Sequence, residues 1–274
     1  MLTFGISFII LTWNSEKYIK DCLNSIFNLE YDNIEVIVID NNSIDKTKEI
    51  ISFFPKVTLV ELDKNYGTTY PRNIGLKRSN QDYKYICILD SDTIINHKAI
   101  ENMIQSLEAK PEYLMAVPRM INTDGESQIS YKKFPTLQIK LFKAFPIRSV
   151  EKIGSKLERY NFDLKQEIYE IDYGISACWM MKRKVLNDIG YLDEDFFYAP
   201  EDVDYCLRVW KSGNKVILAT KSIIVHATQR ISKKRLVSKH NFYAMMDLMK
   251  YFIKHKYLFS AKMVRRIEYK KEEE

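Results

Sequence analysis

The 274-residue sequence is poor in the residues that build irregular or disulfide-linked proteins. Its 8 glycines and 7 prolines are too few for a low-complexity or loop-built chain. Its 4 cysteines are scattered, with no C-x-x-C pair and no zinc spacing, so we expect reduced thiols in a cytoplasmic protein. The contents of 46% hydrophobic and 28% charged residues exclude a disordered or fibrous chain.

Long hydrophobic runs and nucleotide-loop motifs are also missing. No stretch reaches the roughly 18 apolar residues of a membrane span. Residues 4–13 are too short and too interrupted to resemble a signal peptide, and no basic leader precedes them. Because neither G-x-G-x-x-G after the first strand nor G-x-x-x-x-G-K-[ST] occurs, a dinucleotide-dependent dehydrogenase and a P-loop enzyme are disfavoured.

The net charge of +6 is unevenly distributed along the chain. Residues 228–274 contain 13 Lys and Arg against 5 Asp and Glu, a balance of +8, which leaves −2 for residues 1–227. This distribution argues against a uniformly basic nucleic-acid-binding surface and favours a basic tail that meets an anionic partner. We therefore expect one domain in residues 1–227, with halves that meet near residue 120, followed by a basic, amphipathic helical tail.

Continuous apolar runs alternate with helical patterns in the first half of the chain. Strands are predicted for residues 5–11, 34–39, 57–62, 85–89 and 114–117, with helices between them. Strands that are apolar throughout are buried on both faces. The pattern therefore predicts an α/β fold with a mostly parallel central sheet, helices on both of its faces, and a Rossmann-like nucleotide-binding half.

Polar residues gather where four of these predicted strands end. Since the carboxyl ends of parallel strands meet at one edge of a sheet, their side chains converge on one crevice, which predicts a nucleotide-type site. The residues at these ends include Thr12, Asn14, Asp40, Asn65, Asp90 and Asp92.

Asp90 and Asp92 are separated only by Ser91, so in extended backbone both carboxylates project to the same side. Two such oxygen donors suit Mg²⁺ or Mn²⁺ bridging a diphosphate. An isolated D-x-D is more often a turn that caps a helix, but its position beside other polar strand ends favours the metal. His226 ends an apolar run and is a candidate third ligand, although a lone histidine is more often structural.

A second acidic cluster occupies residues 201–204. Pro200 and the helical spacing that follows place Glu201 and Asp202 at a helix N-terminus, where the helix dipole favours ionised carboxylates. The structural alternative is simple capping, with Asp204 and Arg208 as an i,i+4 pair. An ionised aspartate at a loop–helix junction is also suited to act as a general base.

Taken in order, these motifs resemble the family-2 inverting glycosyltransferases of the GT-A fold, and among them the rhamnosyltransferase- and galactofuranosyltransferase-like enzymes. The resemblance covers about residues 5–230. The motifs that carry it are I-I-L-T-W-N-S-E (9–16), V-I-D-N-N-S (38–43), N-Y-G (65–67), R-N-I-G (72–75), I-L-D-S-D-T (88–93), G-Y-L-D-E-D-F-F (190–197), E-D-V-D-Y-C-L-R (201–208) and V-H (225–226).

The resemblance implies a role for each matching residue. Asp40 accepts the N3–H of a uracil or thymine ring, Asp90 meets ribose and metal, and Asp202 deprotonates the acceptor hydroxyl. Asp92 is the principal metal ligand, and His226 completes the metal site. The remaining implied nucleotide-sugar contacts are Thr12, Asn14, Glu16, Asn65, Arg72 and Ser91, and the implied acceptor-side residues are Trp179 and Glu201.

The activity that the resemblance implies is Mn²⁺- or Mg²⁺-dependent, inverting sugar transfer. The donor is a UDP- or dTDP-linked sugar, rhamnose among the options, and the acceptor is a hydroxyl of a cell-surface polysaccharide or lipid-linked glycan. Residues 1–120 then bind the nucleotide and residues 121–227 the acceptor. The sequence departs from the family pattern at Thr68–Pro71, Ala199 and Ala227, which leaves the sugar open. The alternative is a catalytically silent member that binds a nucleotide sugar or a partner.

Two basic segments remain. Residues 131–148 hold five Lys and Arg and no acid among apolar residues, and they either pack on the core or form an acceptor-side or membrane-interface segment. The tail carries a helical stripe that serves as core or subunit contact, or docks with its flanking cations on anionic lipid at the inner face of the cell membrane. The stripe is Phe242, Met245, Met246, Met249, Phe252 and Ile253, and the flanking cations are Lys254, Lys256, Lys262, Arg265 and Arg266.

Overall fold

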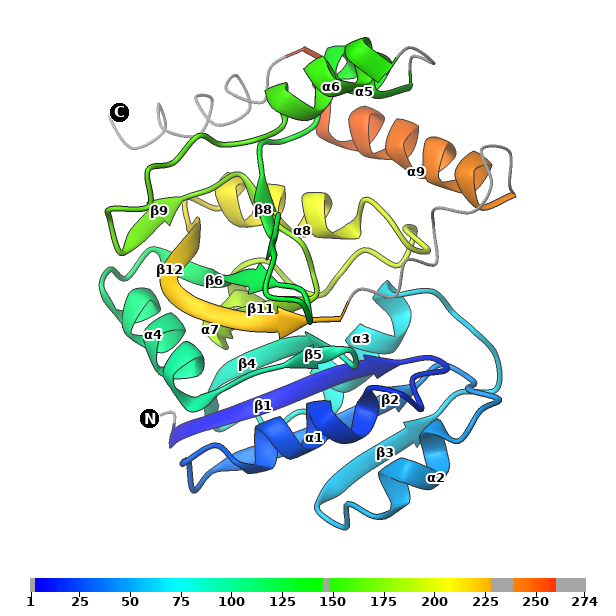
Figure 1. Ribbon diagram of the computed structural model, residues 1–274, viewed down its shortest axis with the longest axis vertical. Coiled ribbons are helices and arrows are strands. Elements are labelled where there is room, and N and C mark those ends of the chain that lie inside the picture. Colours follow the sequence, from blue (N-terminus) through cyan, green and yellow to red (C-terminus); the bar gives the residue numbers. More distant parts are fainter. Residues whose placement is uncertain (1–2, 145–147, 228–238, 260–274) are drawn as a thin grey trace.

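The computed structural model describes residues 3–144, 148–227 and 239–259, and a ten-stranded sheet forms its centre (Figure 1). The strands of this sheet are β1 (Thr3–Thr12), β2 (Ile34–Asp40), β3 (Val57–Glu61), β4 (Tyr83–Asp90), β5 (Thr93–Ile94), β6 (Tyr113–Ile121), β7 (Ser127–Gln128), β9 (Ile168–Glu170), β11 (Cys178–Lys182) and β12 (Lys215–His226). Their order is β3-β2-β1-β4-β11-β6-β12-β5, with β7 on β6 and β9 on β12. A separate small sheet pairs β8 (Tyr131–Lys132) with β10 (Tyr173–Gly174).

The strands run mostly parallel, as predicted. β3, β2, β1 and β4 are parallel to one another, and β12 is parallel to β6. β11 enters antiparallel between β4 and β6 and joins the two halves into one sheet. The five strands predicted for the first half are confirmed, each within a few residues of its predicted ends.

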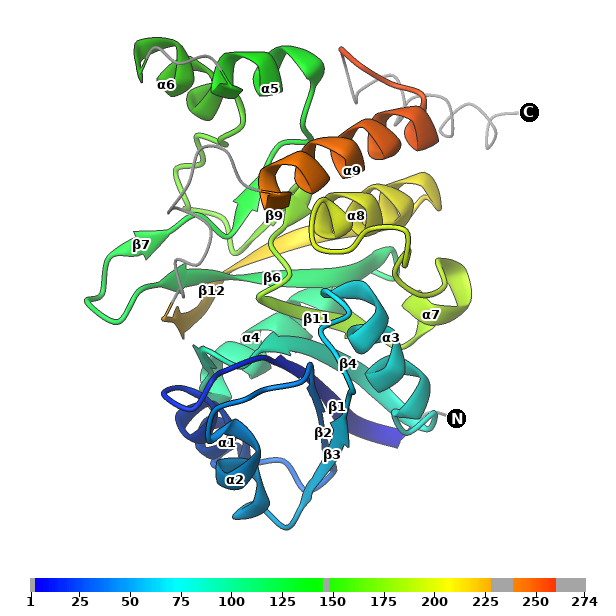
Figure 2. The ribbon, with the colours of Figure 1, turned by 90° about the vertical axis from the view of Figure 1, so that its right-hand side faces the viewer.

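Helices cover both faces of the sheet (Figures 1 and 2). They are α1 (Ile19–Phe27), α2 (Thr47–Ser52), α3 (Thr69–Arg78), α4 (His97–Glu108), α5 (Leu137–Ala144), α6 (Arg148–Leu157), α7 (Lys184–Asp188), α8 (Glu201–Lys211) and α9 (Lys239–His255). One core lies under α1, α2 and α4, and the other lies under α3, α7 and α8. Within β1, Phe8 and Ile10 face the first core and Ile9 the second, because successive side chains of a strand point to opposite faces.

The basic segment of residues 131–148 packs on the protein over much of its described length. Phe134 and Ile139 are buried, whereas Leu141 is exposed. Its lysines surround a carboxylate from outside the segment, the buried Glu158: Lys143 Nζ lies 2.6 Å from it and Lys140 Nζ 3.5 Å. Its charge is therefore partly compensated within the fold. Residues 145–147 lie outside the described part.

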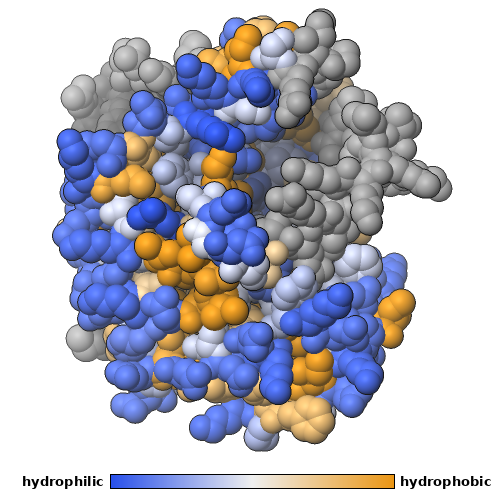
Figure 3. Space-filling model, in the orientation of Figure 1, coloured by the Kyte–Doolittle hydropathy of each residue, from blue (hydrophilic) through white to orange (hydrophobic). Residues whose placement is uncertain are grey.

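The stripe predicted for the tail does not form one buried face. In α9, Tyr251 and Phe252 are buried against α8, but Met249 and Ile253 are exposed. The side chains of Phe242 and Met245, and all of Lys262, Arg265 and Arg266, lie outside what the structure describes. Among the described residues, no helix has the length and apolar character needed to cross a membrane. The face of Figure 3 is largely hydrophilic, with hydrophobic residues gathered near its middle.

Candidate active site

The parallel sheet brings the polar strand ends to one edge, as the sequence predicted. Thr12 at the end of β1 is in register with Asp40 at the end of β2. On the other side of β1, Leu11 is in register with Asp90, the last residue of β4. A nucleotide-sized ligand at this edge can therefore reach all three polar residues.

Thr12 and Asp40 lie side by side at the ends of neighbouring strands. Both residues are buried, and Asp40 Oδ2 accepts a hydrogen bond from the backbone N–H of Ser43 at 2.9 Å. Within the described part of the chain, Asp40 Oδ1 and Thr12 Oγ1 are buried without a hydrogen-bond partner. Buried polar atoms are almost always paired, so these two oxygens are suited to the polar edge of a ligand.

Asn14, Glu16 and Asn65 hold the loops at this edge of the sheet. Asn14 Oδ1 accepts from the Ile44 N–H at 2.9 Å, and Glu16 Oε2 accepts from the Lys46 N–H at 3.2 Å. Asn65 Oδ1 accepts from Asn41 Nδ2 at 3.0 Å. All three residues lie near the strand edge, as predicted, but the bonds they make here connect one loop to another.

The stretch Thr68–Pro71, where the sequence departs from the family pattern, fixes a second loop beside the site. Thr68 N–H donates to Phe197 O at 2.8 Å, and Thr69 Oγ1 donates to Phe196 O at 2.7 Å. Gly67 has φ +79°, and a Cβ there would lie 1.9 Å from Phe197 O, so only glycine allows this approach. The 196–198 loop is thereby placed next to the strand ends.

Asp90, Asp92 and His226 come together although His226 is more than 130 residues away in the sequence. One ligand atom from each lies within 4.8 Å of those of the other two. His226 Nε2 is 3.4 Å from Asp92 Oδ1, while its Nδ1 is 3.0 Å from Gln128 Oε1. Gln128 thus orients the ring so that Nε2 faces the carboxylates, the arrangement that metal-binding histidines use. This set of two carboxylate oxygens and one imidazole nitrogen fits Mn²⁺ or Mg²⁺.

The electrostatics of this cluster agree with a cation site. Burial raises the pKa of Asp90, and Asp92 raises it further, against the opposing charge of Arg72. Burial lowers the pKa of His226, but the two aspartates outweigh burial and raise it overall. A divalent cation would relieve the repulsion between the carboxylates. Ser91, between them, has a separate role, because its hydroxyl lies 2.7 Å from the buried hydroxyl of Ser15.

Arg72 connects the D-x-D motif to α8. Its buried guanidinium lies 2.8 Å from Asp90 Oδ1 through Nη2 and 3.2 Å from Glu201 Oε1 through Nη1. Nη1 also donates to Ser176 Oγ at 2.9 Å. The predicted nucleotide contact thus stands beside Asp90, and Glu201, expected on the acceptor side, is buried and ion-paired instead.

Asp202 lies in the first turn of α8, directly after Glu201. Its Oδ1 accepts from the Val203 N–H at 2.8 Å, and its side chain is half-buried. Burial raises the pKa of Asp202, against the charges of Lys132 and Lys140. This direction is opposite to the lowering that the helix terminus was expected to cause, because burial is the largest influence on this carboxyl group. A raised pKa makes Asp202 a stronger proton acceptor.

Two other sequence predictions have clear outcomes. Trp179, expected on the acceptor side, is fully buried in β11, stacks on Tyr205 and donates to Gly174 O, so it is a core residue. Its place on an apolar strand was the signal for burial. The structural interpretation of Asp204 is confirmed, because its Oδ2 lies 2.9 Å from Arg208 Nε.

Neither Gln128 nor Tyr198 was among the site residues predicted from the sequence. Gln128 is on the two-residue strand β7, and no local pattern marks it as a partner of His226. The Tyr198 ring, half-exposed, lies within electrostatic reach of Asp90, Glu201 and Asp202, and burial together with these carboxylates raises its pKa. An aromatic residue close before the acidic pair was the available signal for Tyr198.

The sequence and the fold match those of known glycosyltransferases. The family model "Glycosyl transferase family 2" matches residues 7–190, so the chain belongs to this family and is a glycosyltransferase. The poly-beta-1,6-N-acetyl-D-glucosamine synthase of Staphylococcus epidermidis is 36% identical over 209 residues. That match covers 75% of this chain and 46% of the relative, so the chain spans less than half of the relative's length.

Solved structures confirm the GT-A fold. S. aureus TarS 1–349 in complex with UDP-GlcNAc has a TM-score of 0.61 at 21% identity, over 90% of this chain and 65% of that chain. GalNAc-T7 with UDP, GalNAc and Mn²⁺ has a TM-score of 0.65 at 16% identity, over 91% of this chain and 47% of that one. The predicted family and fold class are therefore both confirmed.

Proposed function

We propose that this glycosyltransferase is a divalent-metal-dependent, inverting enzyme that transfers a sugar from a nucleotide diphosphate to a hydroxyl of a polysaccharide or lipid-linked glycan. The observation that carries the proposal is a chain of contacts. Arg72 is ion-paired with both Asp90 and Glu201, Asp202 follows Glu201 in α8, and His226 lies beside Asp90. In this arrangement the carboxylates proposed for the metal and the carboxylate proposed as the general base lie on two sides of one buried guanidinium, which supports the proposal.

The residues have distinct tasks in this proposal. Thr12 and Asp40 bind the base, with Asp40 Oδ1 accepting its N3–H. Asp90, Asp92 and His226 hold Mn²⁺ or Mg²⁺, which would offset the charge of the departing diphosphate. Asp202 accepts the proton of the acceptor hydroxyl as its oxygen bonds to the anomeric carbon. Attack from the face opposite the diphosphate inverts the configuration.

A UDP-linked N-acetylhexosamine is the first donor to test. The Staphylococcus epidermidis relative is named for poly-N-acetylglucosamine synthesis, and the TarS structure holds UDP-GlcNAc. These names support a uracil base, which agrees with the unpaired oxygens of Asp40 and Thr12. They favour an N-acetylhexosamine over the rhamnose that the sequence resemblance suggested.

Peripheral contact with a membrane is part of the same proposal. Met249, Ile253 and Phe259 are exposed at the end of α9, and Lys250 and Lys256 lie among them. Apolar side chains flanked by lysines suit the headgroup region of an anionic bilayer. Sedimentation with vesicles of phosphatidylglycerol and phosphatidylcholine, compared with phosphatidylcholine alone, tests this part. Equal pelleting with both, or a concentration-dependent dimer that competes with vesicles, would count against it.

The donor site is tested by a thermal-shift panel of UDP, dTDP, GDP and CDP, each with and without Mn²⁺, on wild type and Asp92→Asn. A ligand at 100 times its dissociation constant stabilises a protein by about 2.7 kcal/mol, which such a panel detects. We expect a Mn²⁺-dependent shift with UDP that is lost in Asp92→Asn. No shift with any nucleotide would refute the donor site.

The proposed general base, Asp202, is tested separately with Asp202→Asn. This variant removes the proton acceptor and leaves Asp40, Asp90 and Asp92 in place. We expect UDP-GlcNAc binding within twofold of wild type and transfer reduced by at least 100-fold, the lower range for loss of general-base catalysis. Wild-type turnover in Asp202→Asn would remove Asp202 from this role.

A further inference from the structure

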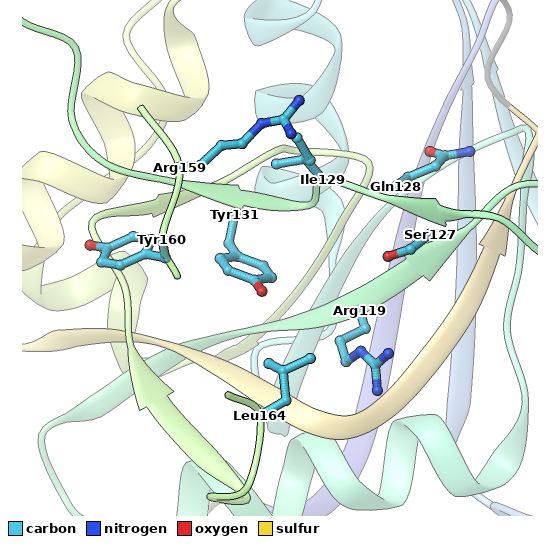
Figure 4. A pocket seen from close by; sticks show the side chains of 8 residues that line it. All are labelled: Arg119, Ser127, Gln128, Ile129, Tyr131, Arg159, Tyr160 and Leu164. Carbon is cyan, nitrogen blue, oxygen red and sulfur yellow. The ribbon is translucent and has the colours of Figure 1, made fainter. Parts of the chain in front are cut away.

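A cleft that the proposed donor site does not use lies on the far side of Gln128. Its volume is about 100 Å³, well below the 300 Å³ or more of a site that encloses a whole small molecule. It has room for a small group such as a phosphate or a carboxylate. Its walls are formed by Arg119, Ser127, Gln128, Ile129, Tyr131, Arg159, Tyr160 and Leu164 (Figure 4).

The cleft is positively charged without compensation. Arg119 and Arg159 line it, and no carboxylate does. Across residues 3–144, 148–227 and 239–259, no ion pair or side-chain hydrogen bond involves either guanidinium. The nearby lysines Lys140 and Lys143, in contrast, are satisfied by Glu158. A pair of arginines left in this state is suited to bind oxyanions, which guanidinium groups bind in a bidentate manner.

The polar and aromatic walls complete the cleft around this charge. In the view of Figure 4, the Tyr131 ring lies between Arg159 on one side and Arg119 with Leu164 on the other. Burial raises the pKa of Tyr131 and the charge of Arg119 opposes the rise, so Arg119 lies within electrostatic reach of the phenol. Leu164 has φ +57°, an uncommon conformation for a residue of its size. Such outliers persist where the surrounding structure holds them.

The cleft is connected to His226 of the proposed metal site through Gln128. Gln128 forms one wall of the cleft and also contacts His226. Gln128 Oε1 lies 3.0 Å from His226 Nδ1, and Gln128 Nε2 donates to the backbone oxygen of His226 at 2.6 Å. Tyr131 on β8 lines the cleft. Its neighbour Lys132 lies close enough to Asp202 to lower the pKa of the Asp202 carboxyl group. The cleft therefore lies beside His226, the candidate metal ligand, with Gln128 as the wall that the two share.

A stack of aromatic rings begins at the cleft wall and packs against the core. Tyr160 stacks on Phe162 with centroids 4.6 Å apart, and Phe162 stacks on Tyr169 at 4.3 Å. Lys133 Nζ lies 5.6 Å above the Tyr160 ring. Ligand sites commonly combine such apolar walls with a few placed polar groups. The two arginines beside these packed rings suit an anionic group carried on a glycan.

We propose that Arg119 and Arg159 bind an anionic group, a phosphate or a carboxylate, on the acceptor glycan, and so select charged acceptors. The proposal rests on the proposed function for the identity of the reaction, but the binding itself does not require turnover. Tyr131 and Gln128 orient the group, and the stacked rings hold the wall of the cleft that Tyr160 forms.

The test is binding of three sugars by isothermal titration calorimetry, with the donor site saturated by UDP and Mg²⁺. The probes are glucose 6-phosphate, glucuronate and neutral glucose, and the proteins are wild type, the double variant R119Q/R159Q and R78Q. Arg78 is exposed on α3 and outside the cleft, so R78Q controls for the loss of surface charge. We expect wild type and R78Q to bind one anionic probe at least tenfold more tightly than R119Q/R159Q does, with glucose unaffected.

The two anionic probes identify the source of the charge, because a phosphate site favours glucose 6-phosphate and a carboxylate site favours glucuronate. Equal binding of both anions to wild type and R119Q/R159Q would overturn the proposal. UDP affinity is measured in separate titrations of the same three proteins without added UDP, and is expected to be unchanged among them. If wild type does not bind UDP, the donor site alone is refuted, so the failures of the two proposals are distinguishable.

Discussion

Arg72 joins Asp90 to Glu201 through the two ends of one guanidinium, at 2.8 Å and 3.2 Å. The two carboxylates come from β4 and α8, which are far apart in the sequence, and the guanidinium between them is almost completely buried. The same contact that supports the fold thereby sets the position of a candidate metal ligand relative to the helix that carries Asp202.

Replacing Arg72 with Met should destabilise the protein by about 3 kcal/mol or more, because removing one partner of a buried ion pair leaves uncompensated charge. Urea unfolding followed by circular dichroism measures this loss as a lower midpoint. Arg78→Met, on the exposed surface of the same helix, is the control and should change the free energy of unfolding by no more than about 0.5 kcal/mol. Equal midpoints for the two variants would show that the bridge adds no stability.

Asp40→Asn should weaken UDP binding about tenfold or more, which corresponds to about 1.4 kcal/mol. The asparagine oxygen can keep the hydrogen bond from the Ser43 N–H, but its amide would present a donor to the N3–H of the base. Calorimetric titration with UDP and Mn²⁺ gives the dissociation constant. An unchanged constant would place the base elsewhere.

The raised pKa of Asp202 predicts a pH dependence of transfer. As the pH falls through this pKa, the carboxyl gains a proton and can no longer accept one, so kcat/KM falls. Burial raises the pKa and Lys132 opposes the rise, so Lys132→Met should move the acid limb of the profile to higher pH. Lys133→Met, at the exposed neighbouring position, is the matched control and should leave the limb in place. A limb that does not move in Lys132→Met would argue against Asp202 as the titrating group.

Asp204 should stabilise the docking of α9 in a pH-dependent manner. Burial raises its pKa, but the hydrogen bond from His255, the charge of Arg208 and the contact with Lys254 lower it overall, from 3.8 to about 2. Because the native pKa is depressed, the stabilisation is present above pH 4 and is lost as the pH falls toward 2. The shift corresponds to about 2 kcal/mol.

Asp204→Asn should remove that contribution at neutral pH and flatten the dependence of stability on pH between 4 and 2. Chemical denaturation at a series of pH values measures both effects. Glu194→Gln, an exposed carboxylate before α8, is a control that should retain the wild-type slope. The same slope in Asp204→Asn as in wild type would show that other carboxylates cause the acid sensitivity.

The central sheet and one edge of the site follow from local patterns in the sequence. Each predicted strand is a short apolar run, and the burial of the neighbours Ile9 and Ile10 in opposite cores needs only the two-residue period of a strand. Since parallel strands end at the same edge, the convergence of Thr12, Asp40 and Asp90 follows from where the apolar runs stop along the chain. The acidic pair at the start of α8 was equally readable from Pro200 and the helical spacing.

The tertiary structure decided the contacts between residues that lie far apart in the sequence, because no local pattern predicts such contacts. Gln128 meets His226 across 98 positions, and Arg72 meets Glu201 across 129. The family resemblance implied Trp179 on the acceptor side, but packing against Tyr205 put it in the core. The sequence by itself thus determined the sheet and its polar edge through short-range periodicity, and its ordered motifs indicated the class of chemistry through their resemblance to a known family. The pairing of Arg72, the orientation of His226 and the arginine cleft depend on which loops pack together, and only the folded chain fixes that.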